Sequence, residues 1–549
     1  MQQSSSIVMF VTPCAALTVR CPEYSKERSM RRLKVAGASI VAAVLLLTGC
    51  ASNGEEPSGG SSDGGSGDND LIIARAADAQ SMDITSVHDN NSIKVGQHIM
   101  ETLFMITPDG SSVEPWLAES YEISDDNLTY TVKLKEGILF SNGDEMTAED
   151  VKFSIDAATA TGAEGWGFVN EPIREVVVVD DYTVEFKLDQ PYAPTLAVLA
   201  MFSNAIVPAD YDGKTKEEFY GEGPIGTGPF VWREWNPGQS IILDKNPNYW
   251  QEGKPAVDSI TWSVVPDAST RELMLLGGEI DINEEPDWSS FVNLQKQDGV
   301  TAELFPSTYM RYMSLNENYD YFADVHVRRA IGYAVDRDAI VDTVTYGNAE
   351  VANSIIMKGL PFHDDTLEGI QYDLDKAKEE MAASGFPDGF STKLLIASGD
   401  SEQASIAQIV QASLAEIGIT VEITQLDPTA NKAARTSMDF EMALMAWYND
   451  IADPDQWTSW ALDADASSRA AYTDWRNEEV VALNKAAATE TDEDARAELY
   501  KELQAIVAEE AYITMFYYTP YKWVVDDSVK GFHVTPLGNY HLEDVTISE

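Results

Sequence analysis

Three aspartates lie among three aromatic residues in the short segment 447–457. The segment follows a mostly apolar run, 440–446, that predicts a buried strand, and Pro454 ends regular structure. Aromatic rings exclude water and a carboxylate supplies charge, so this combination suits the capture of a cation or a free amine. The competing interpretation is a solvated acidic loop, because the chain carries 91 acidic residues.

The sequence around this segment alternates between strand and helix patterns after residue 310. Strands are predicted at 419–423 and from Phe440, and helices after Asp324, at 372–384, around 406–417 and at 493–509. Strands separated by single helices predict a parallel α/β unit, whose ligand sites lie at the carboxyl ends of strands. Segment 447–457 is such an end.

The first half of the chain mixes antiparallel strands with helices. A strand is predicted at 71–75, and a polar segment, 86–92, precedes a helix predicted at 95–104. Further strands are predicted at 129–134, 175–179 and 183–188, and a capping box predicts a helix that starts at Thr147. The overall class is therefore α/β.

Length and charge restrict the possible functions. At 549 residues the chain is expected to form two or three structural units. Its formal net charge of −54 argues against a nucleic-acid partner, since phosphate binding needs a basic surface. The three cysteines, Cys14, Cys21 and Cys50, leave the long remainder without a disulfide framework or a thiolate metal site.

The N-terminal region contains the basic and apolar segments of an export signal, in the usual order. A basic segment, 30–34, precedes an apolar run, 35–47, that is too short for an ordinary membrane-spanning helix. Residues 1–29 precede a plausible start at Met30, so we interpret them as an over-long N-terminus. Residues 51–70 are rich in Gly, Ser and Asp and are typical of a flexible tether.

Two glycine motifs match known signatures only formally. Residues 60–64 fit Gly-x-Ser-x-Gly but lie in the tether, without the strand and helix that a nucleophile elbow needs. Residues 221–226 fit Gly-x-Gly-x-x-Gly, but Pro224 and Pro229 prevent the helix that a dinucleotide site requires. We therefore interpret 221–226 as a backbone turn.

Several longer motifs, in order, resemble the bacterial extracellular solute-binding proteins of family 5. They occupy residues 117–137, 140–144, 147–151, 224–230, 246–250, 277–281, 327–337, 372–378 and 453–455. The resemblance implies a peptide, oligopeptide or nickel carrier for an ABC importer. It also implies a hinged, two-lobed α/β fold of the type II periplasmic-binding-protein kind with an extra subdomain.

The resemblance implies the following organisation. Residues 1–49 are removed, and 50–70 are a lipidated cysteine plus tether. Lobe I is 71–308 and 515–549, with its subdomain at about 100–221, and lobe II is 309–514. Residues 47–50 (Leu-Thr-Gly-Cys) resemble a lipobox, so Cys50 would carry lipid at the extracytoplasmic face of the membrane, at the cell surface or in the periplasm. The protein would be a monomer that delivers its ligand to the permease.

The resemblance also implies ligand contacts. In peptide-binding relatives an aspartate at the position of Asp450 pairs with the ligand's free amine, and Asp453 and Asp455 are interpreted as loop-forming residues. The other expected ligand contacts are Trp447, Tyr448, Asn449, Asn90, Asn91, His88 and Ser398. The loop 397–403 lacks the arginine that clamps a dipeptide's carboxylate, so we expect oligopeptides in preference to dipeptides.

Alternative functions remain open at this point. A metal-chelate or other small-solute binder of the same fold is the first, although no histidine has metal-ligand spacing with another, so neither metal nor cofactor is expected. A carbohydrate-active enzyme is remote, because no catalytic arrangement can be placed and we expect no enzymatic activity. A surface receptor that signals ligand identity is a third alternative.

Overall fold

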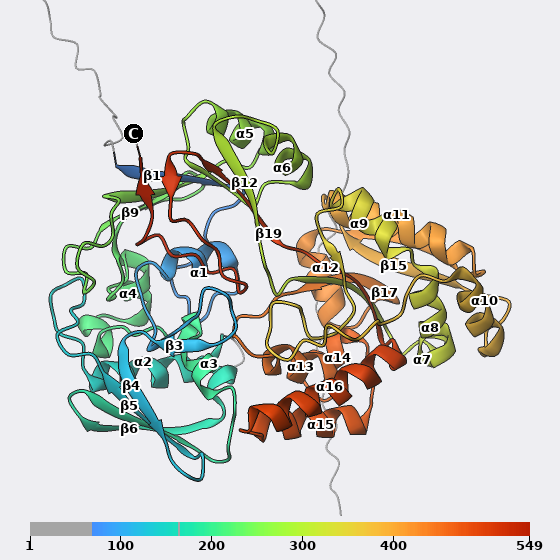
Figure 1. Cartoon of the computed structure of the whole chain (residues 1–549), viewed down its shortest axis with the longest axis horizontal. Helices are drawn as coiled ribbons and strands as arrows, with labels where there is room; N and C mark the ends of the chain where they lie inside the picture. The colour runs from blue at the N-terminus through green and yellow to red at the C-terminus, as the bar shows by residue number, and fades with distance from the viewer. Residues whose placement is uncertain (1–68, 163–164, 549) are drawn as a thin grey trace, which may run out of the picture. The chain divides into compact units, whose positions relative to one another are not determined.

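The computed structural model describes residues 69–162 and 165–548 (Figure 1). Its largest sheet has seven strands in the order β12-β19-β11-β1-β10-β9-β8. These strands are β1 (Asp70–Arg75), β8 (Phe230–Asn236), β9 (Ser240–Lys245), β10 (Ser259–Val264), β11 (Ile282–Glu284), β12 (Val300–Phe305) and β19 (Tyr521–Asp526). Strand β1 pairs in parallel with β10 and β11, and β19 lies between β11 and β12.

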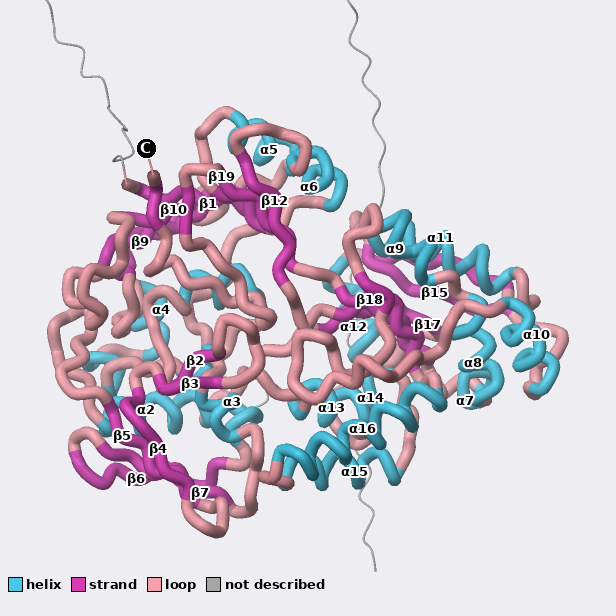
Figure 2. The backbone as a smooth tube through the Cα atoms, in the orientation of Figure 1, coloured by secondary structure: helices cyan, strands magenta, loops and turns pink. Residues whose placement is uncertain are grey.

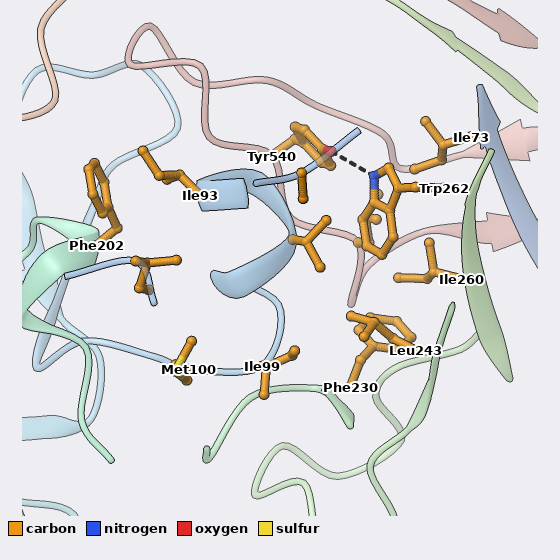
Figure 3. Close-up of a cluster of buried hydrophobic side chains, with 14 of the residues drawn as sticks. Ile73, Ile93, Ile99, Met100, Phe202, Phe230, Leu243, Ile260, Trp262 and Tyr540 are labelled. Carbon is orange, nitrogen blue, oxygen red and sulfur yellow. Dashed lines mark hydrogen bonds between the residues drawn. The ribbon is translucent and has the colours of Figure 1, made fainter. Parts of the chain in front are cut away.

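One apolar core lies against the seven-stranded sheet (Figure 3). Ile73, Ile260 and Trp262 point into it from neighbouring strands and are completely buried. The Trp262 indole Nε1 donates a 3.1 Å hydrogen bond to the hydroxyl of Tyr540, which ties the C-terminal segment to this sheet. Burial of each such apolar side chain stabilises the fold by about 1.5–3 kcal/mol.

A separate antiparallel sheet of four strands has the order β4-β5-β7-β6. Its strands are β4 (Ala118–Ile123), β5 (Thr129–Leu134), β6 (Ile173–Asp180) and β7 (Thr183–Leu188). The alternation predicted at 129–134 is confirmed, since Tyr130, Val132 and Leu134 are buried. Helix α2 (Ala148–Thr159) begins with the predicted capping box, in which the Asp150 carboxylate accepts the Thr147 N–H at 2.8 Å.

The third sheet has six strands in the order β14-β18-β13-β17-β15-β16. These are β13 (Met310–Leu315), β14 (Glu350–Val351), β15 (Ser391–Ala397), β16 (Thr420–Leu426), β17 (Met442–Trp447) and β18 (Ile513–Tyr518). Strands β15, β16 and β17 are parallel, as their connecting helices predict, whereas β13 runs antiparallel to both β17 and β18. The sheet is therefore mixed, not wholly parallel.

The chain passes between the seven-stranded and six-stranded sheets twice, at 306–309 and at 519–520 (Figure 2). The remaining short strands pair as β2 (Phe104–Ile106) with β3 (Val113–Pro115), and as β20 (Val529–Lys530) with β21 (Thr546–Ile547). No helix within the described ranges combines the length and the apolarity that crossing a bilayer requires.

Helices cover the sheets and connect their strands. In the first part of the chain they are α1 (Asn90–Gly96), α3 (Thr195–Leu199), α4 (Lys216–Glu222), α5 (Ala268–Leu276) and α6 (Trp288–Leu294). Around the six-stranded sheet they are α7 (Asp320–Ala323), α8 (Val325–Ala334), α9 (Arg337–Val344), α10 (Leu374–Ala383), α11 (Ser401–Ala415), α12 (Pro428–Thr436), α13 (Asp455–Leu462), α14 (Arg469–Tyr472), α15 (Glu478–Thr489) and α16 (Glu493–Glu510).

The prediction of a helix at 95–104 is wrong. The observed helix is α1, which starts earlier because the Asp89 side chain caps it by accepting the Ser92 N–H at 3.0 Å. After α1 the chain leaves the helical path and lies against the glycine turn, where Gly228 donates to the Ile99 carbonyl at 2.9 Å. A Cβ on Gly228 would lie 2.6 Å from the His98 carbonyl oxygen, so this close approach needs glycine.

Candidate functional site

The predicted loop leaves the end of β17 and is fixed by Asn449. The side-chain oxygen of Asn449 accepts the indole N–H of Trp447 at 3.0 Å, and its amide nitrogen donates to the Asp453 carbonyl at 2.7 Å. Its backbone N–H donates to Oγ1 of Thr308 at 3.0 Å. Asn449 is completely buried, and its side chain holds the loop instead of lining the cavity described below.

Two of the three loop carboxylates are held by residues from outside the loop. The Arg496 guanidinium donates to both carboxylate oxygens of Asp453, at 2.6 and 2.8 Å. The Tyr192 hydroxyl donates to Oδ2 of Asp455 at 2.8 Å. Burial, reinforced by the charge of Asp453, raises the pKa of Asp455. Both carboxylates therefore act in holding the loop and the start of α13.

Asp450, in contrast, lines a cavity of about 310 Å³. Its Oδ2 accepts the Gln456 amide at 2.7 Å, and its backbone N–H donates to the Gln456 side-chain oxygen at 2.7 Å. Within the described ranges no basic residue forms an ion pair with Asp450. Removal from water raises the pKa of Asp450 to about 7, although the Gln456 hydrogen bond opposes this shift. An arriving cation would therefore favour the ionised form.

Aromatic side chains form much of the cavity wall. Trp447 stacks on Trp460 with ring centroids 4.4 Å apart, and its ring also lies 5.0 Å from that of Trp457. Tyr472 meets Trp460 edge to face at 5.4 Å. The other residues that line the cavity are Trp166, Tyr312, Lys432, Arg435, Thr436, Met445, Ala446 and Tyr448. Such walls exclude water and strengthen electrostatic contacts inside the cavity.

Residues from the first half of the chain reach the same site. The ring of His88 lies 4.8 Å from Trp166, a cavity-lining residue. Partial burial, with a smaller contribution from the positive charge of Lys432, lowers the pKa of His88. The Tyr448 hydroxyl donates to the side-chain oxygen of Asn90 at 3.2 Å. The structure thus brings the predicted polar segment 86–92 next to the predicted loop.

Two predicted ligand residues lie away from the cavity lining. The backbone carbonyl of Asn91 accepts a 2.9 Å hydrogen bond from Arg75. Ser398 is exposed, and its backbone N–H donates to the Leu426 carbonyl at 2.7 Å. We therefore do not include either side chain in the proposed ligand contacts.

The sequence-based prediction did not identify two cavity cations, Lys432 and Arg435, both on helix α12. Their isolation in the sequence could have drawn attention to them, because they are the only basic residues between Lys393 and Arg469. Trp166 was also missed, and nothing local could have identified it, because it lies far from Trp447 in the sequence.

Across residues 69–162 and 165–548, no three His, Cys, Asp or Glu side chains gather in a way that could hold a metal ion. The predicted lipid-bearing residue, Cys50, lies outside the described residues.

A family model, described as bacterial extracellular solute-binding proteins, family 5 middle, matches residues 112–469. The glutathione-binding protein GsiB of Salmonella paratyphi A is 28% identical over 87% of this chain and 94% of its own length. The periplasmic binding protein DppA of Helicobacter pylori, solved with peptide STSA, is 30% identical and covers 87% of this chain and 98% of its own, with a TM-score of 0.77.

A third relative has a different ligand. NikA of Brucella suis, solved with Fe(III)-EDTA, is 27% identical and covers 88% of this chain and all of its own, with a TM-score of 0.79. These matches confirm the resemblance and the two-lobed α/β fold, and these relatives are binding proteins, not enzymes. The chain belongs to the bacterial extracellular solute-binding proteins of family 5.

Proposed function

We propose that this protein is the extracytoplasmic substrate-binding component of an ABC importer and captures oligopeptides between its two lobes. The observation that carries the proposal is Asp450, a carboxylate in an aromatic cavity that forms no ion pair with any basic side chain of the described residues. A peptide's terminal ammonium would supply the missing charge. Such an ion pair contributes to affinity when its two members leave water together.

The lobes are proposed to form around the two large sheets, hinged at 306–309 and 519–520. Strand β18 (Ile513–Tyr518) pairs within the six-stranded sheet, which supports placing the return to lobe I after Tyr518 and not at 515. The hydrogen bond from Tyr448 to Asn90 would be one of the contacts made on closure. Closure would present a surface to the permease.

The preference for oligopeptides over dipeptides rests on the loop 397–403 and not on the size of the cavity. A volume of about 310 Å³ is at the lower end for a ligand site, so it would accept the N-terminal part of a peptide. The remainder would run between the lobes as an added strand. The loop 397–403 offers no basic residue, and its Ser398 is exposed, which argues against a clamp for a dipeptide carboxylate.

A chelate or another anionic solute is the second candidate. Relatives bind Fe(III)-EDTA or, by name, glutathione, and the cavity of this chain contains Lys432 and Arg435. These cations could hold carboxylates of such a ligand, whereas a chelate such as Fe(III)-EDTA offers no ammonium for Asp450. We rank this candidate second for that reason.

The anchor and location belong to the same proposal. Residues 47–50 would direct lipidation at Cys50, and the monomeric protein would stay at the outer face of the membrane, held by residues 51–70. Mass spectrometry of the protein extracted from membranes would detect a lipid-modified N-terminal cysteine. An unmodified Cys50 in the mature protein would contradict the anchor and leave the ligand proposal intact.

The ligand proposal is tested with Asp450→Asn and matched peptides. Isothermal titration calorimetry would compare a peptide that has a free amine with its N-acetylated form. We expect Asp450→Asn to weaken binding of the free-amine peptide by about tenfold or more and to leave the weaker acetylated peptide nearly unchanged. Asp298→Asn, in an exposed turn, is the matched control. Equal losses for both peptides would contradict the role of Asp450.

A further inference from the structure

Two basic side chains, Lys432 and Arg435, line the cavity. No carboxylate of the described residues lies within 4.0 Å of either cation. This is unexpected in a chain with 91 acidic and 37 basic residues, where a carboxylate is usually available. Both side chains project from helix α12 and are three positions apart, which places them on one helix face.

The guanidinium of Arg435 has unused hydrogen-bonding capacity. Its Nη1 lies 3.3 Å from the sulfur of Met445, which is a weak acceptor. Its Nε is buried and has no acceptor among the described residues. A buried N–H without an acceptor is unfavourable, so an anion that enters the cavity would satisfy it.

The cavity separates this positive group from Asp450. Asp450 and Arg435 line the same space but form no ion pair with each other. A ligand that carries an ammonium and a carboxylate close together could therefore pair with both. Arginine is suited to this role, because its planar fork binds carboxylates through two parallel hydrogen bonds.

We propose that Arg435 and Lys432 form a carboxylate subsite, so that preferred ligands carry an anionic group near their free amine. The inference rests on the proposed function, since Asp450 must take the amine. Among ligands longer than a dipeptide, two structures provide this chemistry. One is a peptide with Asp or Glu at its first or second position, and the other is a γ-linked glutamyl residue, whose α-carboxylate and amine share a carbon.

Calorimetry with paired peptides tests the subsite. One pair is Glu-Ala-Ala-Ala and Gln-Ala-Ala-Ala, and the other is Ala-Glu-Ala-Ala and Ala-Gln-Ala-Ala. A separate ligand, γ-Glu-Cys-Gly, represents the γ-linked glutamyl compounds. We expect at least one carboxylate ligand to bind about tenfold or more tightly than its neutral match. Arg435→Gln should abolish that preference, Lys432→Gln should reduce it, and Arg435→Lys should retain part of it.

The matched control is Lys378→Gln, which removes a positive charge from an exposed position on α10. It should leave the preference unchanged, and thermal unfolding would establish that each variant is folded. If all tetrapeptides bind equally and Arg435→Gln changes nothing, the subsite is wrong and peptide capture stands. If no peptide or γ-glutamyl ligand binds, both the proposed function and the subsite are wrong.

Discussion

Arg496, on helix α16, donates to both carboxylate oxygens of Asp453, at 2.6 and 2.8 Å, and Asp453 follows Asp450 by three residues in the same loop. Both side chains are 7% exposed. Arg496 also donates to the Ala487 carbonyl at 2.8 Å, which connects the loop to helix α15. The pair thus positions the proposed amine-binding carboxylate without facing the ligand.

Loss of one partner from this pair should destabilise the fold strongly. Asp453→Asn or Arg496→Met would leave a buried group uncompensated, so we expect the free energy of unfolding to fall by about 3–5 kcal/mol. Denaturation by urea would measure the change. The exposed pair of Arg476 and Asp465 is the control, and Arg476→Ala should cost less than about 1 kcal/mol. A similar small loss at both pairs would contradict this role.

Peptide affinity should fall in acid because of Asp450. The pKa of Asp450 is about 7 in the ligand-free protein, and a ligand ammonium needs the ionised carboxylate. Affinity should therefore decrease by up to about tenfold for each pH unit below 7. It should also decrease above about pH 8, where a free α-amine loses its proton. The optimum is expected between these limits.

Titration calorimetry from pH 5.5 to 8.5 would measure this profile. Near pH 7 the binding of a free-amine peptide should also release protons, because the ligand favours the ionised form of Asp450. In Asp450→Asn the acidic decline should disappear, whereas the alkaline decline from the peptide's own amine should remain. A wild-type affinity that does not change between pH 5.5 and 7 would contradict the prediction.

Tyr192→Phe should destabilise the protein more at high pH than at low pH. The Tyr192 hydroxyl donates to Asp455, whose pKa is already raised by burial. Without that donor the folded-state pKa of Asp455 would rise further above its unfolded value. The ionised form would then be penalised, so stability is lost as pH rises. We expect a loss of about 1–3 kcal/mol at pH 8 and less at pH 5.

Chemical denaturation at the two pH values would measure this difference. Tyr182→Phe is the matched control, since the Tyr182 hydroxyl donates to Glu145 at 2.6 Å on the exposed surface. That variant should lose less than about 1 kcal/mol at either pH. If Tyr192→Phe shows the same loss at pH 5 and pH 8, its effect does not act through ionised Asp455.

Local patterns predicted the elements well where a capping box, an apolar helix face or an apolar run was present. Helix α16, the capping box of α2 and the strand that ends at Trp447 follow directly from such patterns. The helix predicted at 95–104 is wrong because tertiary packing against Gly228 determines the path of that segment. Periodicity carries no information about such long-range contacts.

The candidate site was only partly predictable for a related reason. The segment after β17 was identified because its aspartates and aromatic residues are adjacent in sequence. Trp166 reaches the cavity from a segment that is remote in sequence, so no local pattern connects it with Asp450. Arg435 is nearer, on helix α12 just before β17, but its place in the cavity depends on how that helix packs in the fold. Asn449 had the right residue type for a ligand contact, but its hydrogen bonds to Trp447 and Asp453 determine its role.

The position of β19 has a consequence for biosynthesis. This strand lies inside the seven-stranded sheet, between β11 and β12, yet it comes from residues 521–526 of a 549-residue chain. The sheet therefore lacks an interior strand until translation is almost complete. A nascent chain with this gap cannot complete its seven-stranded sheet until nearly all of its residues have been synthesised.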